Sequence, residues 1–185
     1  MDMDKLGYLA EFIRIRNVAD QSIAKIIERP AHPGHISEYV AAAIFDIELH
    51  ETAVYKGSDG RFRSGPFAGR QVNVKYKSRN DGLLNLVANL DSSQHPDTYL
   101  VMTGPRSGAI SSRGMVAPWI ITNAYLFDSV PLIQGLVEQG RKPGVATSVR
   151  KHLWDAASIF PDPNPDLFPL SADQYAALDL FAPVT

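Results

Sequence analysis

The segment from Gln71 to Lys77 alternates strictly between polar and apolar residues. Successive side chains of a β-strand point to opposite faces, so this period of two predicts a strand with one face in a core. Val72, Val74 and Tyr76 are expected to face that core. The polar face then holds, in order, Gln71, Asn73, Lys75 and Lys77. A fold for this chain must therefore bury one side of the strand and leave room for charged groups on the other.

This strand closes the most basic stretch of the sequence, which runs from Lys56 to Arg79. The stretch contains seven lysine and arginine residues and a single acid, Asp59. The whole chain has a net charge of −2, so the positive charge is local and is not a general field of the protein. Glycine and proline residues after Asp59 predict a hairpin approach to the strand. Because Asp59 and Lys75 are 16 residues apart, a strand–turn–strand path permits them to meet.

Before this stretch, apolar residues at helical spacing predict three helices. The first covers residues 5–15, and the second is capped by Asn17 and ends near Glu28. Proline and glycine at 30–34 then break the chain, and a third helix is expected from His35 to about Phe45. The break is longer than the turn of a helix-turn-helix motif, so packing helices are favoured over DNA-reading ones. The apolar arc of the third helix is predicted to contain Ile36, Tyr39, Val40, Ala43 and Ile44.

Glu38 lies off that apolar arc, yet the residues three, four and seven positions after it are Ala41, Ala42 and Phe45. These positions share one side of a helix with Glu38. A fully solvated helix face usually carries charged or amide side chains, so this side is expected to be partly covered. A partly buried carboxylate needs a metal ion or a basic group as its partner. A surface glutamate among alanines is the alternative.

The remaining segments alternate between strand and helix patterns. The predicted strands are 52–55, 98–103 and 145–149, and residues 119–127 form another apolar run. The predicted helices are 130–139 and 171–180. Ser171 and Gln174 form a capping box for the last helix, and residues 83–90 fit a short helix or a covering loop. Helices followed by strands interleaved with helices predict a single α/β domain, or an α+β domain, with a central mixed sheet flanked by helices. Its expected parts are N-terminal helices at 1–34, a core at 35–150 and a C-terminal extension at 151–185.

Composition and missing motifs exclude several classes of function. The chain has no cysteine, so disulfides, cysteine-zinc sites and thiol chemistry are excluded, which is typical of a cytoplasmic protein. No apolar run approaches the roughly 18 residues that span a bilayer, so no membrane partner is expected. The five histidines show no zinc-site spacing. Ser58 lacks a G-x-S-x-G context, and the glycine-rich segment 104–108 lacks the lysine of a P-loop.

Acids, a lysine and an amide near one strand can support phosphodiester hydrolysis. Magnesium held by one or two carboxylates stabilises charge in the transition state and positions a water molecule. A lysine beside it stabilises the developing charge, and basic side chains nearby hold a nucleic-acid backbone without reading its sequence. The candidates are Asp59 and Glu38 for the metal, Lys75 for the scissile phosphate, and Arg61, Lys77 and Arg79 for the backbone.

The run from Gly34 to Lys75 resembles the core of the PD-(D/E)XK superfamily of restriction-endonuclease-like proteins. In that superfamily a helix carries an acid, a strand turn carries an aspartate, and the next strand carries an acid or glutamine two residues before a lysine. Glu38 is similar to the helix acid, Asp59 to the aspartate and Lys75 to the lysine. The resemblance implies an αβββαβ core with an N-terminal helical extension, Mg²⁺ as cofactor with Mn²⁺ as a substitute, DNA as substrate, and a homodimer.

Four short motifs also resemble a family of uncharacterised bacterial proteins within that superfamily. They are Arg14-Ile15-Arg16-Asn17, the segment from Gly34 to Glu38, the segment from Asp59 to Phe62, and the segment from Val72 to Lys75. This likeness spans much of the chain. It implies no activity of its own, because that family has no assigned activity.

Asn73 departs from the superfamily pattern, because an acid or a glutamine is expected there. An amide oxygen can ligate Mg²⁺ but brings no negative charge, so metal affinity is expected to fall unless Glu38 or another acid compensates. Gln71 lies on the same face and could substitute if the register shifts by two.

Three hypotheses stay open. They are a magnesium-dependent DNA endonuclease of restriction or repair type with Asn73 as a weak metal ligand, a catalytically silent module that binds nucleic acid or a partner on the same fold, and an unrelated α/β domain whose basic strand faces solvent.

Overall fold

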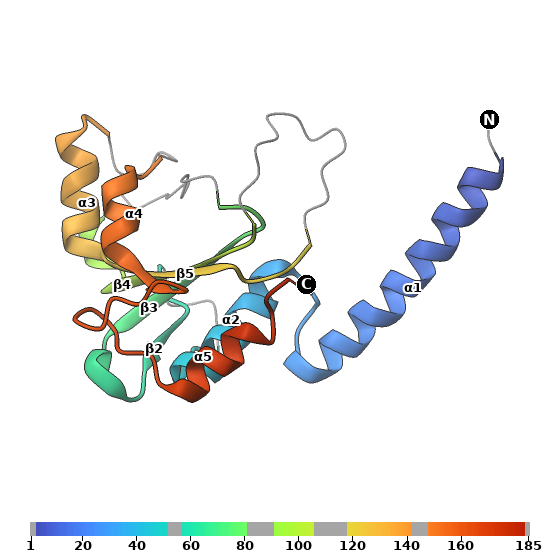
Figure 1. Cartoon of the computed structure of the whole chain (residues 1–185), viewed down its shortest axis with the longest axis horizontal. Coiled ribbons are helices and arrows are strands. Elements are labelled where there is room, and N and C mark those ends of the chain that lie inside the picture. The colour runs from blue at the N-terminus through green and yellow to red at the C-terminus, as the bar shows by residue number, and fades with distance from the viewer. Residues whose placement is uncertain (1–2, 52–56, 81–90, 106–117, 142–147, 184–185) are drawn as a thin grey trace.

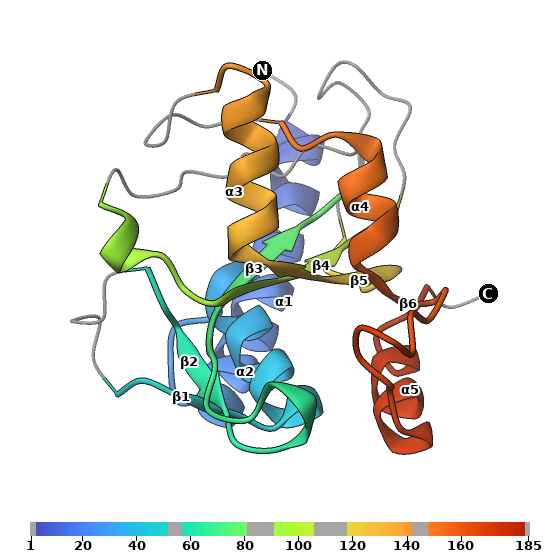
Figure 2. The ribbon, with the colours of Figure 1, turned by 90° about the vertical axis from the view of Figure 1, so that its left-hand side faces the viewer.

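The computed structural model describes residues 3–51, 57–80, 91–105, 118–141 and 148–183. The strands are β1 (Ile47–Leu49), β2 (Gly60–Phe62), β3 (Gln71–Lys77), β4 (Thr98–Thr103), β5 (Asn123–Asp128) and β6 (Ser158–Phe160). The helices are α1 (Met3–Ile27), α2 (Pro33–Phe45), α3 (Ser129–Glu138), α4 (Lys151–Ala157) and α5 (Ala172–Asp179), with short 3₁₀ turns at Gly65–Phe67 and Ser92–Gln94. Figure 2 shows α3 and α4 on one side of the sheet and α2 and α5 on the other. The predicted α/β class, with a central mixed sheet flanked by helices, is confirmed.

The six strands form one sheet in the order β1-β2-β3-β4-β5-β6. Strands β3 and β4 run parallel, whereas the other neighbouring pairs are antiparallel. Parallel neighbours need a crossover connection, and residues 78–97 make it here. The predicted short helix or loop at 83–90 belongs to this connection but lies outside the described residues, as does the predicted strand at 52–55.

The alternation of β3 divides two hydrophobic cores, one on each face of the sheet. On the first face, Val72 and Val74 pack with α2 and α5. On the second face, Tyr99 and Val101 of β4 pack with α3 and α4. Because side chains alternate, Asn73 and Lys75 lie on this second face. The predicted strand from Gln71 to Lys77 is confirmed, with Val72 and Val74 buried and Tyr76 half-buried.

Helix α2 confirms the predicted third helix but is rotated relative to the predicted apolar arc. Tyr39 and Ala43 of that arc are exposed, whereas Ala41 and Phe45 are buried. Because residues 41–43 are all alanine, the apolar spacing does not show which of them faces the core. The packing of α2 against β3 and α5 selects Ala41. The expectation that the Glu38 side of the helix is partly covered is confirmed.

The prediction of two separate N-terminal helices is wrong, because α1 is one continuous helix. Asn17 lies in its middle and caps nothing. No proline or glycine occurs between residues 8 and 29, so a capping residue alone does not end the helix. Arg16 and Asp20, one turn apart, form an ion pair at 3.4 Å across this region. Neither α1 nor another helix among the described residues has the length and apolar character that crossing a bilayer requires.

The segment from residue 151, predicted as a C-terminal extension, contributes to the central sheet and the core. Strand β6 pairs with β5, and Leu178 of α5 is fully buried. The predicted capping box of Ser171 and Gln174 is confirmed at the start of α5. The Gln174 side chain also donates to the Ile44 carbonyl at 2.9 Å, which ties α5 to the end of α2.

Candidate functional site

Asp59 lies where β2 stops pairing with β3. Its backbone N–H donates to the Val72 carbonyl, and its own carbonyl accepts from the His50 N–H, both at 2.9 Å. Its carboxylate Oδ2 accepts from the backbone N–H of Val74 at 2.7 Å. The carboxylate thus satisfies a β3 donor on the edge that β2 has left, which a buried backbone N–H requires. Two of these bonds fix the Asp59 backbone, and the third fixes its carboxylate.

Glu38 projects from the second turn of α2 and has a basic partner. Its side chain is 20% exposed, and its Oε2 accepts from the Arg29 guanidinium at 2.9 Å. Arg29 also lies 3.4 Å from the His50 carbonyl. The partner expected from sequence is therefore a basic group in this structure. Arg29 was not among the predicted site residues, because it precedes the Pro30 to Gly34 break and no local pattern links it to Glu38.

Glu38 and Asp59 open into one cavity of about 420 Å³. Two neighbouring elements thus contribute carboxylates to a shared space, α2 on one side and the β1–β2 connection on the other. The cavity is also lined by Arg29, His35, His50, Glu51 and Ser58. None of these five residues was predicted as a site residue.

Ser58 and His50 approach each other in this cavity without forming an activated nucleophile. The His50 Nε2 lies 3.3 Å from the Ser58 Oγ. Ser58 is buried, and its hydroxyl donates to the Gly60 carbonyl at 3.0 Å. The Val72 carbonyl also lies 3.3 Å from this hydroxyl. A hydroxyl has one proton to donate, so two backbone carbonyls compete with His50 for it. These hydrogen bonds are more typical of a serine that stabilises the hairpin than of a serine nucleophile.

The pKa values of both carboxyl groups in the cavity are raised. Burial raises the pKa of Asp59, and the Val74 N–H, Lys75, His50 and Arg29 oppose this only in part. Burial also raises the pKa of Glu38, the negative charge of Asp59 raises it further, and Arg29, His35 and Lys75 oppose the rise. A nearby positive charge favours the charged form of a buried carboxylate. The structure therefore brings Glu38, Asp59 and Lys75 within electrostatic reach of one another.

Asn73 takes a different position from these three. Its side chain is buried, and its Oδ1 has no hydrogen-bond partner within the described residues. Asn73 and Lys75 are not among the described residues that line the cavity. Both side chains start on the second face of the sheet. The four-carbon stem of Lys75 gives its ammonium group a longer reach than the short side chain of Asn73 gives its amide. An acceptor without a partner is costly inside a protein, so the Asn73 oxygen is a position where a bound cation or water would be stabilised.

The donor set determines which metal arrangement is possible. No group of three or more acids and histidines able to hold a metal ion occurs in the described parts of the chain. Mg²⁺ commonly binds one or two protein carboxylates and completes its shell with water and phosphate oxygens. Asp59 and Glu38 fit this arrangement once Arg29 is displaced from Glu38.

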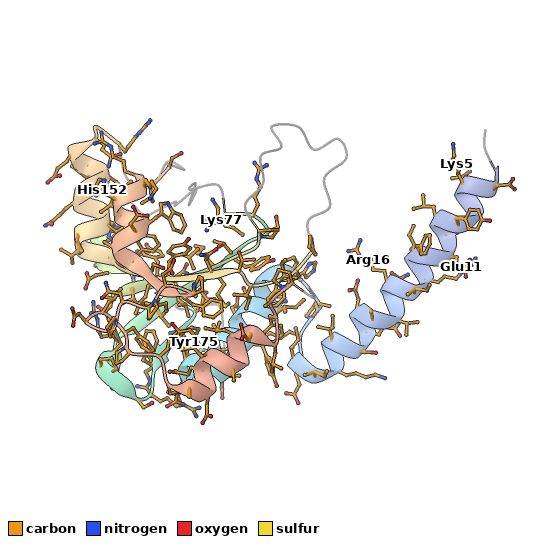
Figure 3. The ribbon with its side chains drawn as sticks, viewed as in Figure 1. Lys5, Glu11, Arg16, Lys77, His152 and Tyr175 are labelled. Carbon is orange, nitrogen blue, oxygen red and sulfur yellow. The ribbon has the colours of Figure 1, made fainter. Side chains whose placement is uncertain are left out.

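The residues predicted to hold a nucleic-acid backbone are split between two places. Arg61 lies opposite Gln71 at the start of β3 and is paired with Glu48 at 2.7 Å. Lys77 ends the same strand, six residues away, which is about 20 Å at the rise of a β-strand. Figure 3 shows Lys77 on the side of the sheet that carries α4. Lys77 and the nearby Arg79 are half-buried. Among the described residues, Arg61 thus lies at the opposite end of β3 from Lys77.

Acids from other elements also balance the basic stretch itself. The ion pairs are Arg61 with Glu48, Arg63 with Asp46, and Arg70 with Asp128, each at 2.7 Å. Three of the seven basic residues of the stretch are therefore paired with acids from other elements in the folded protein.

No protein-family model matches the sequence, and no curated protein is significantly similar to it. The resemblance to the PD-(D/E)XK superfamily therefore stays a prediction, and the grounds for a function are the element order and the cavity that Glu38 and Asp59 share.

Proposed function

We propose that the protein is a magnesium-dependent DNA endonuclease of restriction or repair type, with its reaction centre at Glu38, Asp59 and Lys75. One observation carries the proposal. Carboxylates from α2 and from the residue before β2 open into one cavity, and the Lys75 charge acts on both. The order α2-β1-β2-β3 followed by a parallel β4 supports it, because the αβββαβ core of the superfamily begins in the same way.

Each residue has a role that follows from its surroundings. Asp59 and Glu38 would hold Mg²⁺, and Asn73 would contribute a weak or water-mediated contact. The bound metal would supply positive charge at the phosphate and orient a water molecule. Lys75 donates to a phosphate oxygen and stabilises the negative charge that develops there. Arg29 neutralises Glu38 in the free protein and becomes available to a phosphate oxygen when a cation takes its place.

Lys75→Ala tests the proposal directly. It is expected to slow nicking of supercoiled plasmid in Mg²⁺ or Mn²⁺ by about 10²-fold, since removing one group that stabilises transition-state charge costs about that much. Lys151→Ala is the matched control, because Lys151 is an exposed lysine on α4 paired with Asp155. Nicking that persists in EDTA, or that Lys75→Ala leaves unchanged, would contradict a metal-dependent site at this place.

A catalytically silent module that binds DNA or a partner on the same fold is the second candidate. The uncharged Asn73 favours it, since two carboxylates without a third charge bind Mg²⁺ less tightly. DNA binding that is intact in EDTA, with no cleavage in either metal, identifies this case. An electrophoretic mobility shift with the same plasmid measures it alongside the nicking reaction.

Asn73→Asp separates the two candidates further. The new carboxylate is expected to tighten Mn²⁺ binding by about tenfold, because the charge of the ligand set tunes the affinity of such sites. In EDTA the same variant should unfold at a lower temperature, because it places an unpaired charge at a buried position. Calorimetric titration with Mn²⁺ and thermal unfolding in EDTA give the two readouts. Unchanged Mn²⁺ affinity would show that residue 73 lies outside the metal's reach.

A further inference from the structure

A second cavity, of about 420 Å³, lies on the face of the sheet that α3 and α4 cover. Its inner part contains the half-buried Asn80, which follows β3, the half-buried Asn123 of β5, and the buried Tyr125 of β5. Its outer part contains exposed residues of α4 and of the segment after β6. Figure 1 shows α4 beside α3 and above β5. None of the described residues that line this cavity lines the one that Glu38 and Asp59 share.

A glycine allows Asn80 to reach this cavity. After β3 the chain passes the end of β4, where Gly104 lies against the backbone of Ser78. A Cβ atom at residue 104 would collide with the Ser78 carbonyl, so only glycine permits this close approach. The Asn80 N–H donates to the Pro105 carbonyl at 3.1 Å. The backbone at Asn80 is therefore held next to the end of β4, and its side chain extends to β5.

The two asparagine side chains are joined in a defined orientation. The Asn80 Nδ2 donates to the Asn123 Oδ1 at 3.1 Å and to the Tyr125 hydroxyl oxygen at 2.6 Å. An amide nitrogen carries two protons, so both protons of Asn80 are used. The Asn80 Oδ1 and the Asn123 Nδ2 have no hydrogen-bond partner among the described residues. One acceptor group and one donor group thus remain for a ligand, side by side.

The outer part of the cavity carries charges of both signs. The Lys151 Nζ lies 2.7 Å from each carboxylate oxygen of Asp155, so these two charges balance each other. The Ser158 hydroxyl donates to the Asp162 carbonyl at 3.2 Å and keeps lone pairs that can accept. The exposed Asp162 carboxylate has no partner in the described part of the chain. The described lining residues thus carry one positive and two negative charges.

We propose that this cavity binds one ring of a neutral saccharide, and that the Asn80 Oδ1, the Asn123 Nδ2 and the Asp162 carboxylate hydrogen-bond to its hydroxyl groups. The inference does not rest on the nuclease proposal. A hydroxyl group both donates and accepts, so adjacent hydroxyls of a sugar can satisfy an acceptor and a donor that lie side by side. Sites for small molecules have volumes of roughly 300–1,000 Å³, and this cavity lies within that range. Because β5 already holds the Asn80 amide, ordering this group costs little binding free energy.

Three other classes of ligand fit this cavity less well. A nucleobase needs the face of an aromatic ring or an apolar side chain for stacking. Tyr125 is buried, however, and its ring packs edge-on against Trp154, with 4.6 Å between the centroids. A phosphate group would meet a lining with a net negative charge. A divalent cation would find only Asp162 as an unengaged carboxylate among the described lining residues, because Lys151 engages Asp155.

NMR titration of the full-length, isotope-labelled protein tests the proposal. The side-chain amide signals of Asn80 and Asn123 report on the inner part of the cavity. The probes are D-glucose, D-galactose, D-mannose and D-ribose, and at least one of them is expected to shift both signals saturably. A dissociation constant on the order of 1 mM is expected for a ligand of this size. No saturable shift with any of the four sugars overturns the proposal.

Asn123→Asp tests the assigned donor. The variant keeps an oxygen that accepts from Asn80 but replaces the open amide donor with a second acceptor. With the sugar that binds the parent, and followed through the Asn80 signal, the dissociation constant should rise at least about tenfold. Asn17→Asp makes the same chemical change at an exposed position of α1 and should leave the affinity unchanged. Equal affinities of Asn123→Asp and the parent overturn the assignment.

Asp162→Asn is a second variant with little risk to folding, because Asp162 is exposed. It should weaken sugar binding by about three- to tenfold, and thermal unfolding checks that both variants keep the parent fold. Titrations with inorganic phosphate, adenosine and Ca²⁺ cover the three other classes of ligand. A saturable shift of the amide signals with one of these and with no sugar overturns the proposal. None of these outcomes bears on plasmid nicking.

Discussion

Asp59→Asn is expected to lower DNA cleavage by about 10³-fold, the largest effect of any single change at the site. The substitution removes a negative charge that would hold Mg²⁺. It keeps an oxygen that accepts from the Val74 N–H, so the hairpin should stay in place. Plasmid nicking in Mg²⁺ measures the loss. Asp46→Asn is the control, because Asp46 lies on the surface in a pair with Arg63.

The same substitution is expected to stabilise the protein at neutral pH. Burial raises the pKa of Asp59, so its charged form is less stable in the folded protein than in the unfolded chain. Removing that charge should increase the free energy of unfolding by on the order of 1 kcal/mol. For a chain of this length, that gain raises the melting temperature by about 2–4 °C. Loss of cleavage together with a gain in stability distinguishes a functional carboxylate from a structural one.

The pH dependence of this gain has a definite sign. Above the raised pKa of folded Asp59 the carboxyl group is charged in both states, and the full penalty applies. As the pH falls through that raised pKa toward the ordinary value of 3.8, folded Asp59 takes up a proton and the penalty disappears. The melting temperatures of the parent and Asp59→Asn should therefore converge near pH 4 in EDTA.

Asp46→Asn should show the opposite sign. The Ser64 hydroxyl and Arg63 lower the pKa of Asp46, so its charge stabilises the fold at neutral pH. The stability that this charge contributes is present above pH 3.8 and is lost as the pH falls through the lowered pKa. Calorimetry of both variants from pH 8 to acid pH checks the pair. A lower melting temperature for Asp59→Asn at pH 7 would contradict the burial argument.

Gly60→Ala is expected to produce the largest loss of stability, by about 3 kcal/mol or a melting temperature about 6–12 °C lower. Gly60 pairs with Leu49 on one side and Val72 on the other. A methyl group there would collide with the backbone carbonyl of Glu48 and lie 2.9 Å from a methyl group of Ile47. A backbone atom within a strand pair cannot move aside as a flexible side chain can, so β1 and β2 must separate. Asp59 is the next residue and should lose its position as well.

Gly34→Ala is the matched control for this change. Gly34 lies in the first turn of α2, and no heavy atom would lie within 4 Å of an added methyl group. The variant should keep the parent stability or gain a few tenths of a kcal/mol, because alanine restricts the unfolded chain. Thermal unfolding monitored by circular dichroism compares the two. Equal melting temperatures for Gly60→Ala and the parent would contradict the tight contact between β1 and β2.

Local patterns in the sequence predicted the elements that are specified by interactions within a few residues. Strict alternation predicted β3 from its first to its last residue, and Ser171 with Gln174 predicted the start of α5. Alanines beside Glu38 predicted that its side of α2 is covered. In each case the signal and the structure that it specifies occupy the same short segment, so hydrophobic periodicity and capping are informative.

Tertiary structure decided the partners of the charged groups. The pairing of Arg29 with Glu38 crosses a proline-rich break, and Arg70 meets Asp128 from 58 residues away. Helix α1 also stays unbroken through Asn17, and large apolar side chains in its N-terminal half remain exposed. The sequence by itself determined which face of β3 is apolar and that Asp59 lies one hairpin before Lys75. Only the folded chain decided that Arg29 pairs with Glu38 and that acids from other elements pair with three arginines of the basic stretch. An ion pair depends on distance in space and leaves no periodic trace along the chain.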